Sequence, residues 1–198
     1  MSELSFEPHS TAIVVIDLQK GIVGLEGSPH ASKTVIANCA AILAAARSTG
    51  VQPFLVHVGF SPNGADALRV ISDQPMRASG QMPPDWTDLI PELNQQRADI
   101  EILKRQWGAF YGTGLELHLR RRNLSTIVLC GIATEFGVES TARDAYERGF
   151  EQIFAEDAMT GRSAESHENA VKCIFPRMGR VRSTAEIVDA LRANESVS

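Results

Sequence analysis

Two charged residues stand directly at the ends of predicted strands. Asp17 follows residues 11–16, TAIVVI, a continuous β-branched apolar run that is typical of a buried parallel strand. Lys104 follows residues 100–103, IEIL. Because the carboxyl ends of parallel strands face a common crevice, both side chains can lie in the same crevice. A carboxyl group beside an ammonium group can donate or accept a proton, but strand-end charges are common, and a capping aspartate and a solvated surface lysine explain the pattern equally well.

A third candidate feature is the turn Gly131-Ile132-Ala133-Thr134, which follows a predicted strand over 126–130. It leads into a helix, and the first N–H groups of a helix have no intrahelical partners. Such groups can bind an anion or a developing oxyanion. Every strand-to-helix turn has this property, so the turn indicates a binding site only if it lies beside Asp17 and Lys104.

Other common signatures are missing from the sequence. It contains no GxGxxG, no GxxxxGK[ST] and no HExxH, and its five histidines do not fall into a metal-ligand spacing. We therefore expect neither a cofactor nor a metal site. Cys130, at the apolar end of a strand, is expected to pack in the core. Trp107, Phe110 and Tyr111 follow Lys104 closely and line either an apolar pocket or the core.

The elements that must position these residues alternate between apolar strands and helical segments. This order is typical of an α/β fold with a doubly wound, Rossmann-like, mostly parallel sheet and helices on both faces. The helix starts are indicated by capping signals at Thr113 with Glu116, at Thr134, and at Ser183 with Glu186. Residues 59–84 are rich in Gly, Pro, Ser, Asn and Asp and are expected to cover a site or to hide a short helix at Ala65 to Ile71. Strands are expected at 11–16, 53–58, 100–103, 126–130, 152–155 and near 180–182, and helices at about 33–48, 114–122, 135–148 and 163–173 and after 183.

The length and composition of the chain are typical of a globular protein with one domain. Its 198 residues suit a single domain over 1–198, and no internal repeat or linker divides it. The net charge of −5 argues against a nucleic-acid partner, and no run approaches the apolar length of a membrane span. Three cysteines without a CxxC pair and an N-terminus without an export pattern favour a cytoplasmic location.

Four segments in order resemble the isochorismatase-like hydrolases, also called the cysteine hydrolase superfamily. They are TAIVVIDLQKGI around Asp17, ILKRQWGAFYGTGLELHLRRRN around Lys104, TIVLCGIATEFGVESTARDAYERGF around the fourth strand, and AEDAMTGRSAESHENAV after it. Within that superfamily the chain looks closest to bacterial members of the YecD type. No single segment is decisive, but the ordered set is specific.

The resemblance implies a site and one departure from it. Asp17 and Lys104 correspond to the family's catalytic aspartate and lysine, whereas the nucleophilic cysteine falls on Gly137. A cis peptide inside the turn would be Ile132–Ala133. The resemblance also implies a small-molecule substrate and a homo-oligomer. The candidate substrate-binding residues are Gln19, Arg105, Trp107, Phe110, Ala133, Thr134 and Phe136.

Because Gly137 has no side chain, a thiolate mechanism is closed to this chain. Some members of the family also have glycine at this position, and those that cleave a vinyl ether do so without a covalent enzyme intermediate. The resemblance therefore implies an acid-assisted hydrolase in which Asp17 protonates a vinyl-ether-like carbon and Lys104 positions a substrate carboxylate or tunes Asp17. Two alternatives stay open. One is an amidase that uses another nucleophile, such as Ser140 or Thr141, and the other is a small-molecule-binding protein without catalysis. Isochorismate is one candidate substrate, and nothing in the sequence singles it out.

Overall fold

A single sheet of six parallel strands forms the centre of the fold in the computed structural model, which describes residues 4, 7–74 and 82–193. The order β3-β2-β1-β4-β5-β6 reverses direction between β1 and β4, as in doubly wound dinucleotide-binding folds. The predicted α/β class and parallel sheet are therefore confirmed. The strands are β1 (Thr11–Ile16), β2 (Gln52–Val58), β3 (Ile100–Lys104), β4 (Thr126–Ile132), β5 (Glu151–Thr160) and β6 (Arg180–Arg182).

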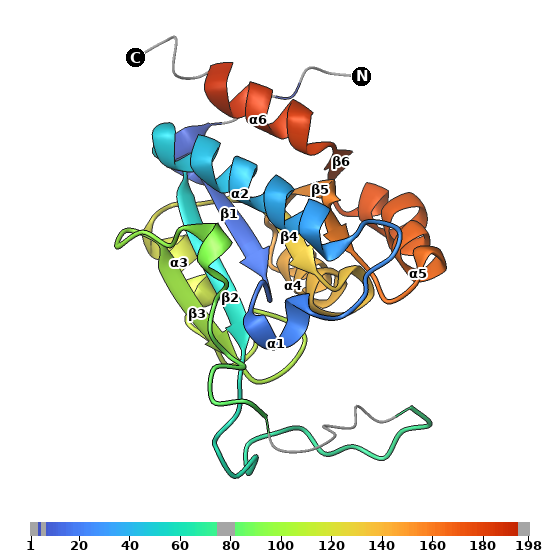
Figure 1. Cartoon of the computed structure of the whole chain (residues 1–198). Coiled ribbons are helices and arrows are strands. Elements are labelled where there is room, and N and C mark those ends of the chain that lie inside the picture. The colour runs from blue at the N-terminus through green and yellow to red at the C-terminus, as the bar shows by residue number, and fades with distance from the viewer. Residues whose placement is uncertain (1–3, 5–6, 75–81, 194–198) are drawn as a thin grey trace.

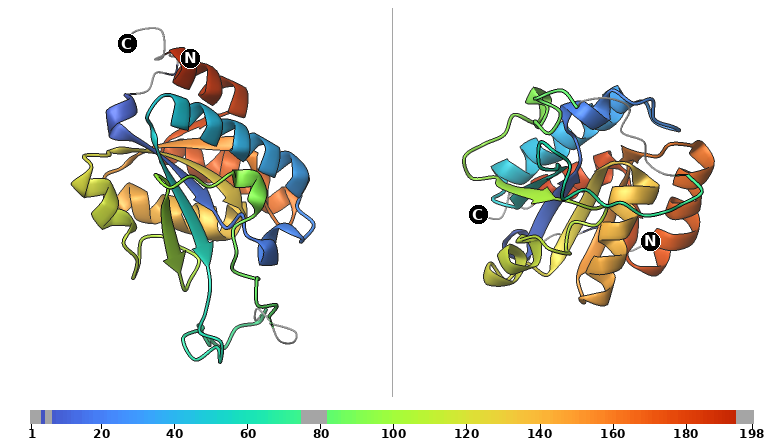
Figure 2. Two further views of the ribbon diagram at one scale, coloured as in Figure 1. Left: turned by 60° about the vertical axis from the view of Figure 1, so that its left-hand side comes forward. Right: turned by 90° about the horizontal axis from the view of Figure 1, so that it is seen from below.

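Helices cover both faces of the sheet (Figures 1 and 2). The helices α2 and α6 lie together over one face, and α3 and α4 lie over the other (Figure 2). The α-helices are α1 (Lys20–Val23), α2 (Ser32–Ser48), α3 (Leu115–Arg121), α4 (Glu139–Glu147), α5 (Ala164–Asn169) and α6 (Thr184–Ala193). Short 3-10 turns are η1 (Pro8–Ser10), η2 (Pro91–Leu93) and η5 (Phe175–Arg177), and π-helical turns are η3 (Thr134–Val138) and η4 (Ala170–Ile174).

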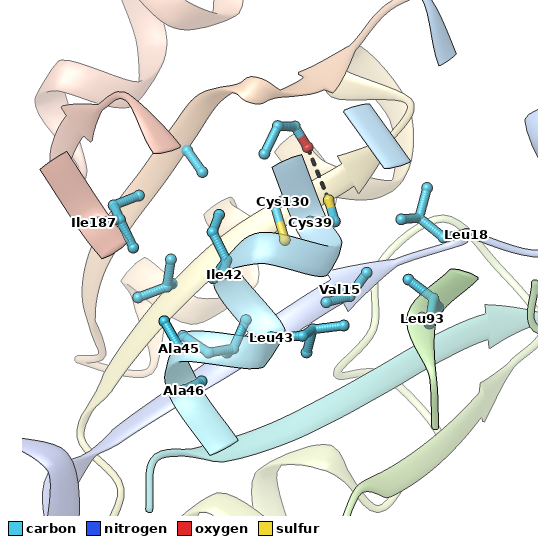
Figure 3. Packing of buried hydrophobic residues seen from close by; sticks show 14 of the residues in the cluster. Val15, Leu18, Cys39, Ile42, Leu43, Ala45, Ala46, Leu93, Cys130 and Ile187 are labelled. Atoms are coloured by element: carbon cyan, nitrogen blue, oxygen red, sulfur yellow. Dashed lines mark hydrogen bonds between the residues drawn. The ribbon is translucent and has the colours of Figure 1, made fainter. Parts of the chain in front are cut away.

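The strand β1, which is apolar apart from Thr11, is buried because both of its faces are covered. Ile13 and Val15 point to the α2 and α6 side, while Val14 and Ile16 point to the α3 and α4 side. Figure 3 shows Val15 close to Leu43 of α2 within the first of these two cores. Fully burying one such side chain contributes roughly 1.5–3 kcal/mol, so the two faces together fix the position of the C-terminal end of β1.

Two predicted helix boundaries are matched by side-chain or backbone geometry. The helix α2 ends shortly before Gly50, whose φ of 75° lies in the left-handed region that glycine tolerates. At the start of α6, the Ser183 hydroxyl accepts the Glu186 N–H while the Glu186 carboxylate accepts the Ser183 N–H, which is the expected capping box.

Other sequence-based expectations were wrong in detail. Thr134 does not cap a helix over 135–148: it lies inside η3, its hydroxyl contacts His167, and α4 begins at Glu139. The Thr113 hydroxyl accepts the Leu115 N–H at 3.1 Å, but α3 has no side-chain cap at Gly114.

The fifth strand is also longer than predicted. It does not stop before Glu156 but continues to Thr160 through an irregularity: the partner of Leu129 is Phe154, whereas the partner of Gly131 is already Met159. Such bulges bend a strand and re-aim its side chains. Glu156 projects from this irregular stretch.

The long connection after β2 contains no helix at Ala65 to Ile71, where the chain forms a turn, a bend and irregular backbone. Its described residues, 59–74 and 82–90, include a part that stands away from the body of the fold (Figure 1). Part of the predicted 59–84 segment, residues 75–81, lies outside the described residues. Within the described ranges, no helix combines the length and apolar character needed to cross a membrane.

Candidate active site

Asp17 and Lys104 meet in an ion pair beyond the carboxyl ends of β1 and β3. The Lys104 Nζ donates to Asp17 Oδ2 at 2.7 Å and to the Gln106 carbonyl at 3.1 Å. Lys104 is only 2% exposed and Asp17 6%. The two strands are separated by β2 in the sheet, so only the long lysine side chain can span the gap. The structure therefore brings Asp17 and Lys104 together, as predicted.

Burial dominates the electrostatics of Asp17. Removal of the carboxyl group from water raises its pKa from 3.8 to about 6, against the lowering effect of Lys104 as a charge and hydrogen-bond donor and a smaller lowering effect of His57. The second oxygen, Oδ1, is buried and has no hydrogen-bond partner within the described chain. One oxygen is thus held by the ammonium group, and the other is available to a proton or a ligand.

The turn after β4 lies directly against the end of β1. Gly131 has a φ of 115°, and a Cβ atom placed on it would overlap the carbonyl oxygen of Ile16, so no larger residue fits there. The Ile132–Ala133 peptide is cis, as the family resemblance implied. The Ala133 carbonyl then accepts the N–H groups of Phe136 and Val138, both at 3.2 Å, and so starts η3.

Gly137 faces Asp17. A Cβ atom built on Gly137 would lie 3.2 Å from Asp17 Oδ2, 3.6 Å from the Trp107 carbonyl oxygen and 2.8 Å from Cγ2 of Ile16. A side chain at position 137 would therefore enter the site. It would also displace Ile16, because 2.8 Å is closer than real Cβ contacts allow.

Two aromatic rings flank this position. Trp107 and Phe136 have ring centroids 4.9 Å apart at an interplanar angle of 52°. Trp107 is 47% exposed, and Phe136 is half-buried. Aromatic rings that are exposed near a buried carboxyl group can form the apolar wall of a small-molecule site.

Three other predicted binding residues have their polar or apolar groups engaged elsewhere. The Gln19 amide is held by the backbone of Val58 and Trp86, with contacts of 2.7 to 3.1 Å. Arg105 donates to Asp66 at 2.7 Å and to the Gly59 carbonyl at 2.9 Å, since successive residues at a strand end point in opposite directions. Phe110 is 4% exposed in the core beside α3 and α4, next to Phe150. These contacts indicate structural roles for all three.

Thr134 leads to residues that sequence reasoning missed. It is fully buried, and its hydroxyl oxygen lies 2.9 Å from Nδ1 of His167 on α5. Burial lowers the pKa of His167 to about 4, with a further lowering by His30 and an opposing effect of Glu168. His30 and Glu156 lie beside His167. Because His30, Glu156 and His167 are far apart in the chain, no sequence spacing could have revealed them.

The similarity of the chain to known proteins agrees with this architecture. The model of the isochorismatase domain family matches residues 11–186. The chain is 50% identical over 188 residues to the uncharacterised isochorismatase family protein YecD of Escherichia coli O157:H7, an alignment that spans 95% of this chain and all of that protein. It is 31% identical over 211 residues to the ureidoacrylate amidohydrolase RutB of Pantoea ananatis, spanning 95% of this chain and 84% of that one.

A solved structure gives the same result in three dimensions. An isochorismatase family protein from Burkholderia thailandensis superimposes with a TM-score of 0.91 at 40% identity and covers 96% of this chain and 100% of its own. A buried Asp–Lys pair at the carboxyl edge of a doubly wound sheet, in a chain with these relatives, defines the class of isochorismatase-like hydrolases. The chain is a member of the isochorismatase family.

Proposed function

We propose that this protein is an acid-assisted hydrolase of a small molecule, with Asp17 as the proton donor and without a covalent cysteine intermediate. The observation that carries the proposal is the state of the Asp17 carboxyl group: it is buried, its pKa is raised to about 6, and its Oδ1 has no partner within the described chain. With that pKa, about a tenth of the carboxyl groups are protonated at pH 7. A general acid functions best when its pKa lies near the working pH.

The Lys104 contact determines which oxygen delivers the proton. Because Oδ2 accepts the lysine N–H at 2.7 Å, the proton is expected on Oδ1. The ammonium group also stabilises the Asp17 carboxylate after the proton has left, because its positive charge and its hydrogen bond favour the ionised form. Lys104 is therefore proposed as the residue that tunes and orients the acid.

A vinyl ether is the substrate class that this arrangement suits. The Asp17 proton would add to the terminal alkene carbon, and water would add to the oxygen-bearing carbon and give up a proton to the Asp17 carboxylate. The resulting hemiketal breaks into an alcohol and a ketone, so atoms and protons balance. Trp107 and Phe136, which flank Gly137, would cover the apolar side of the substrate, and the backbone of Ala133 and Gly137 would face it.

The amidase alternative is supported by kinship to RutB, whose name describes an amidohydrolase. It requires a nucleophile, and we propose that Gly137 occupies the position of the family's cysteine. None of the chain's three cysteines substitutes for it: Cys39 and Cys130 are buried in the core, and Cys173 is exposed on η4. Burial raises the pKa of the Cys39 thiol further from the thiolate form.

The hydroxyl nucleophiles are also poorly placed. The Thr141 hydroxyl donates to the Gly137 carbonyl at 2.6 Å and accepts the Ala109 N–H at 3.1 Å, so it is fully used in holding η3. Ser140 is half-buried on the same helix, α4. An amidase reaction through either residue would need a substrate bound away from the Asp17 carboxyl group.

The experiment is a hydrolysis screen with isochorismate as the vinyl ether and with simple amides and carbamoyl compounds. Wild type, Asp17→Asn and Gly137→Cys are compared, and Gly137→Ala is the control for the steric effect of a Cβ atom. The proposal expects vinyl-ether turnover by wild type, lost in Asp17→Asn. Amide turnover by wild type would favour the amidase alternative. Specific binding without turnover, together with amidase activity gained by Gly137→Cys alone, would favour a binding protein that lacks its nucleophile.

We also propose that the protein acts as a cytoplasmic homo-oligomer on a small molecule rather than on nucleic acid or a membrane. The net charge of −5 supports the absence of a nucleic-acid partner. Sedimentation equilibrium of the purified chain tests the oligomeric state. The proposal predicts a mass at least twice that of one chain.

A further inference from the structure

A second cluster of chemically capable side chains lies outside the Asp17–Lys104 site. His30 from the segment before α2, Glu156 from the irregular stretch of β5 and His167 from α5 each place one potential ligand atom within 4.8 Å of the other two. His30 Nε2 lies 3.6 Å from Glu156 Oε2, and the two imidazole rings meet edge to face with centroids 5.4 Å apart. We propose that these residues form a binding site for one divalent transition-metal ion of the zinc type.

The ligand set fits that chemistry. Two imidazoles and one carboxylate form a common three-residue zinc site that leaves one position for water or another ligand. Metal–ligand bonds of about 2.0–2.2 Å place tetrahedral ligands roughly 3.4 Å apart. The His30–Glu156 separation already has about that value, and the remaining contraction from 4.8 Å is within the reach of side-chain rotation. The two nitrogen ligands disfavour Mg²⁺ and Ca²⁺, which prefer oxygen.

The orientation of His167 supports the assignment independently. Its Nδ1 lies 2.9 Å from the Thr134 hydroxyl, which leaves Nε2 as the nitrogen for a metal. A metal-binding histidine usually donates its other N–H to an oxygen acceptor, which fixes the tautomer and the ring plane. Thr134 has that position here. It is fully buried, so the contact is shielded from competing water.

The backbone on which the three ligands stand is itself held in place. Ser28 and Gly161 exchange two backbone hydrogen bonds of 3.0 Å, which tie the segment before His30 to the end of β5. Ser163 caps α5 by accepting the Ser166 N–H at 3.1 Å. The carbonyl of Ser163 accepts the His167 N–H at 3.2 Å. A site whose ligands stand on braced elements loses little conformational entropy when the ion binds.

The proposed ion has a structural consequence for the first site. Through His167 it would fix Thr134, the last residue of the turn that borders Asp17. Exposure gives the ion access, because the side chains of His30 and Glu156 are 28% and 39% exposed. The role assigned to the ion is therefore positioning of the turn rather than chemistry on the substrate.

The test is a calorimetric titration of the untagged, chelator-treated full chain with zinc sulfate. We expect one zinc ion per chain in wild type and at least tenfold weaker binding in His30→Gln and in Glu156→Gln. His9→Gln, which changes an exposed histidine on η1, is the matched control and should bind as wild type does.

Thermal unfolding followed by circular dichroism in the presence of a chelator controls for a loss of stability in the variants. The two variants should unfold at the same temperature as wild type when no metal is available. A second readout is cobalt(II), whose visible absorption bands become intense in a tetrahedral site and should be lost in both variants. Absence of zinc binding by wild type would overturn the proposal and leave only a contact between His30 and Glu156. Binding that is undiminished in His30→Gln and Glu156→Gln would place the ion elsewhere and overturn it equally.

Discussion

The buried Asp17 carboxyl group should make the folded state less stable as the pH rises through the range from 4 to 6. Its pKa is 3.8 in the unfolded chain and about 6 in the folded one, so between these values the native state binds the proton more tightly than the unfolded state does. The stabilisation that this proton provides is complete below about pH 4 and is lost as pH rises through 6. Most acidic groups, which have lowered pKa values when folded, show the opposite slope.

The magnitude follows from the difference between the two pKa values. A difference of about 2 pH units corresponds to about 3 kcal/mol, of which roughly 2–3 kcal/mol falls between pH 4 and pH 7.5. Because Asp17 is only 6% exposed, solvent screening reduces this value little.

The perturbation that isolates this effect is the double variant Asp17→Asn, Lys104→Met. A single Asp17→Asn change would leave the Lys104 ammonium buried without its counter-charge, which costs several kcal/mol by itself. The double variant removes both charges and leaves all other titrating groups in place.

The assay is urea unfolding of wild type and the double variant at half-unit steps from pH 4 to pH 7.5. The difference between the two free energies of unfolding, wild type minus variant, should fall by roughly 2–3 kcal/mol over that range. A difference that is independent of pH, or that rises with pH, would refute the raised pKa and with it the case for Asp17 as a proton donor near neutrality.

Three further predictions concern activity and stability. Vinyl-ether hydrolysis should lose about tenfold in kcat/KM for each pH unit above about 6, measured in initial-rate profiles, because only the protonated Asp17 is active; a flat profile up to pH 8 would contradict this. Gly137→Ala should bind substrate more weakly and lose stability by about 1–3 kcal/mol in urea melts, since its Cβ atom meets Ile16 at 2.8 Å, and an unchanged KM would mean that substrate does not approach position 137. Asp99→Asn should cost about 3 kcal/mol of unfolding free energy, because the 1% exposed Asp99 carboxylate pairs with Arg47 at 2.6 Å; a loss below about 0.5 kcal/mol would show that the pair contributes little.

The fold could be predicted from the sequence where apolar pattern and turn chemistry agree. The run TAIVVI and the Gly50 stop each carry a local signal, and both elements appear as predicted. The irregular part of β5 carries no such signal, because Glu156 and Asp157 interrupt the apolar run and suggest a strand end. Tertiary contacts overrule that suggestion: the Asp157 carboxylate accepts the Thr184 N–H at 2.7 Å, and its carbonyl accepts from Asn38 at the same distance.

The candidate site was predictable only in its centre. The carboxyl ends of parallel strands lie at one edge of the sheet, so the pairing of Asp17 with Lys104 could be predicted from the sequence. The directions of the Gln19 and Arg105 side chains could not be predicted, because their partners lie at the end of β2 and in the long connection after it. A pocket lining depends on loop conformation, and sequence periodicity does not describe loops.

The backbone of Asp17 has a φ of 52°, in the left-handed region, where its N–H donates to the Val56 carbonyl at 2.8 Å. Asparagine and aspartate adopt this conformation far more readily than alanine or branched residues, which lose about 1–2 kcal/mol there. The choice of replacement at this position therefore decides what a mutagenesis experiment measures. An alanine would remove the acid and disturb the backbone corner that presents it, whereas an asparagine preserves the corner and the side-chain shape, so that its effect comes from the lost carboxyl group and the unpaired Lys104 ammonium.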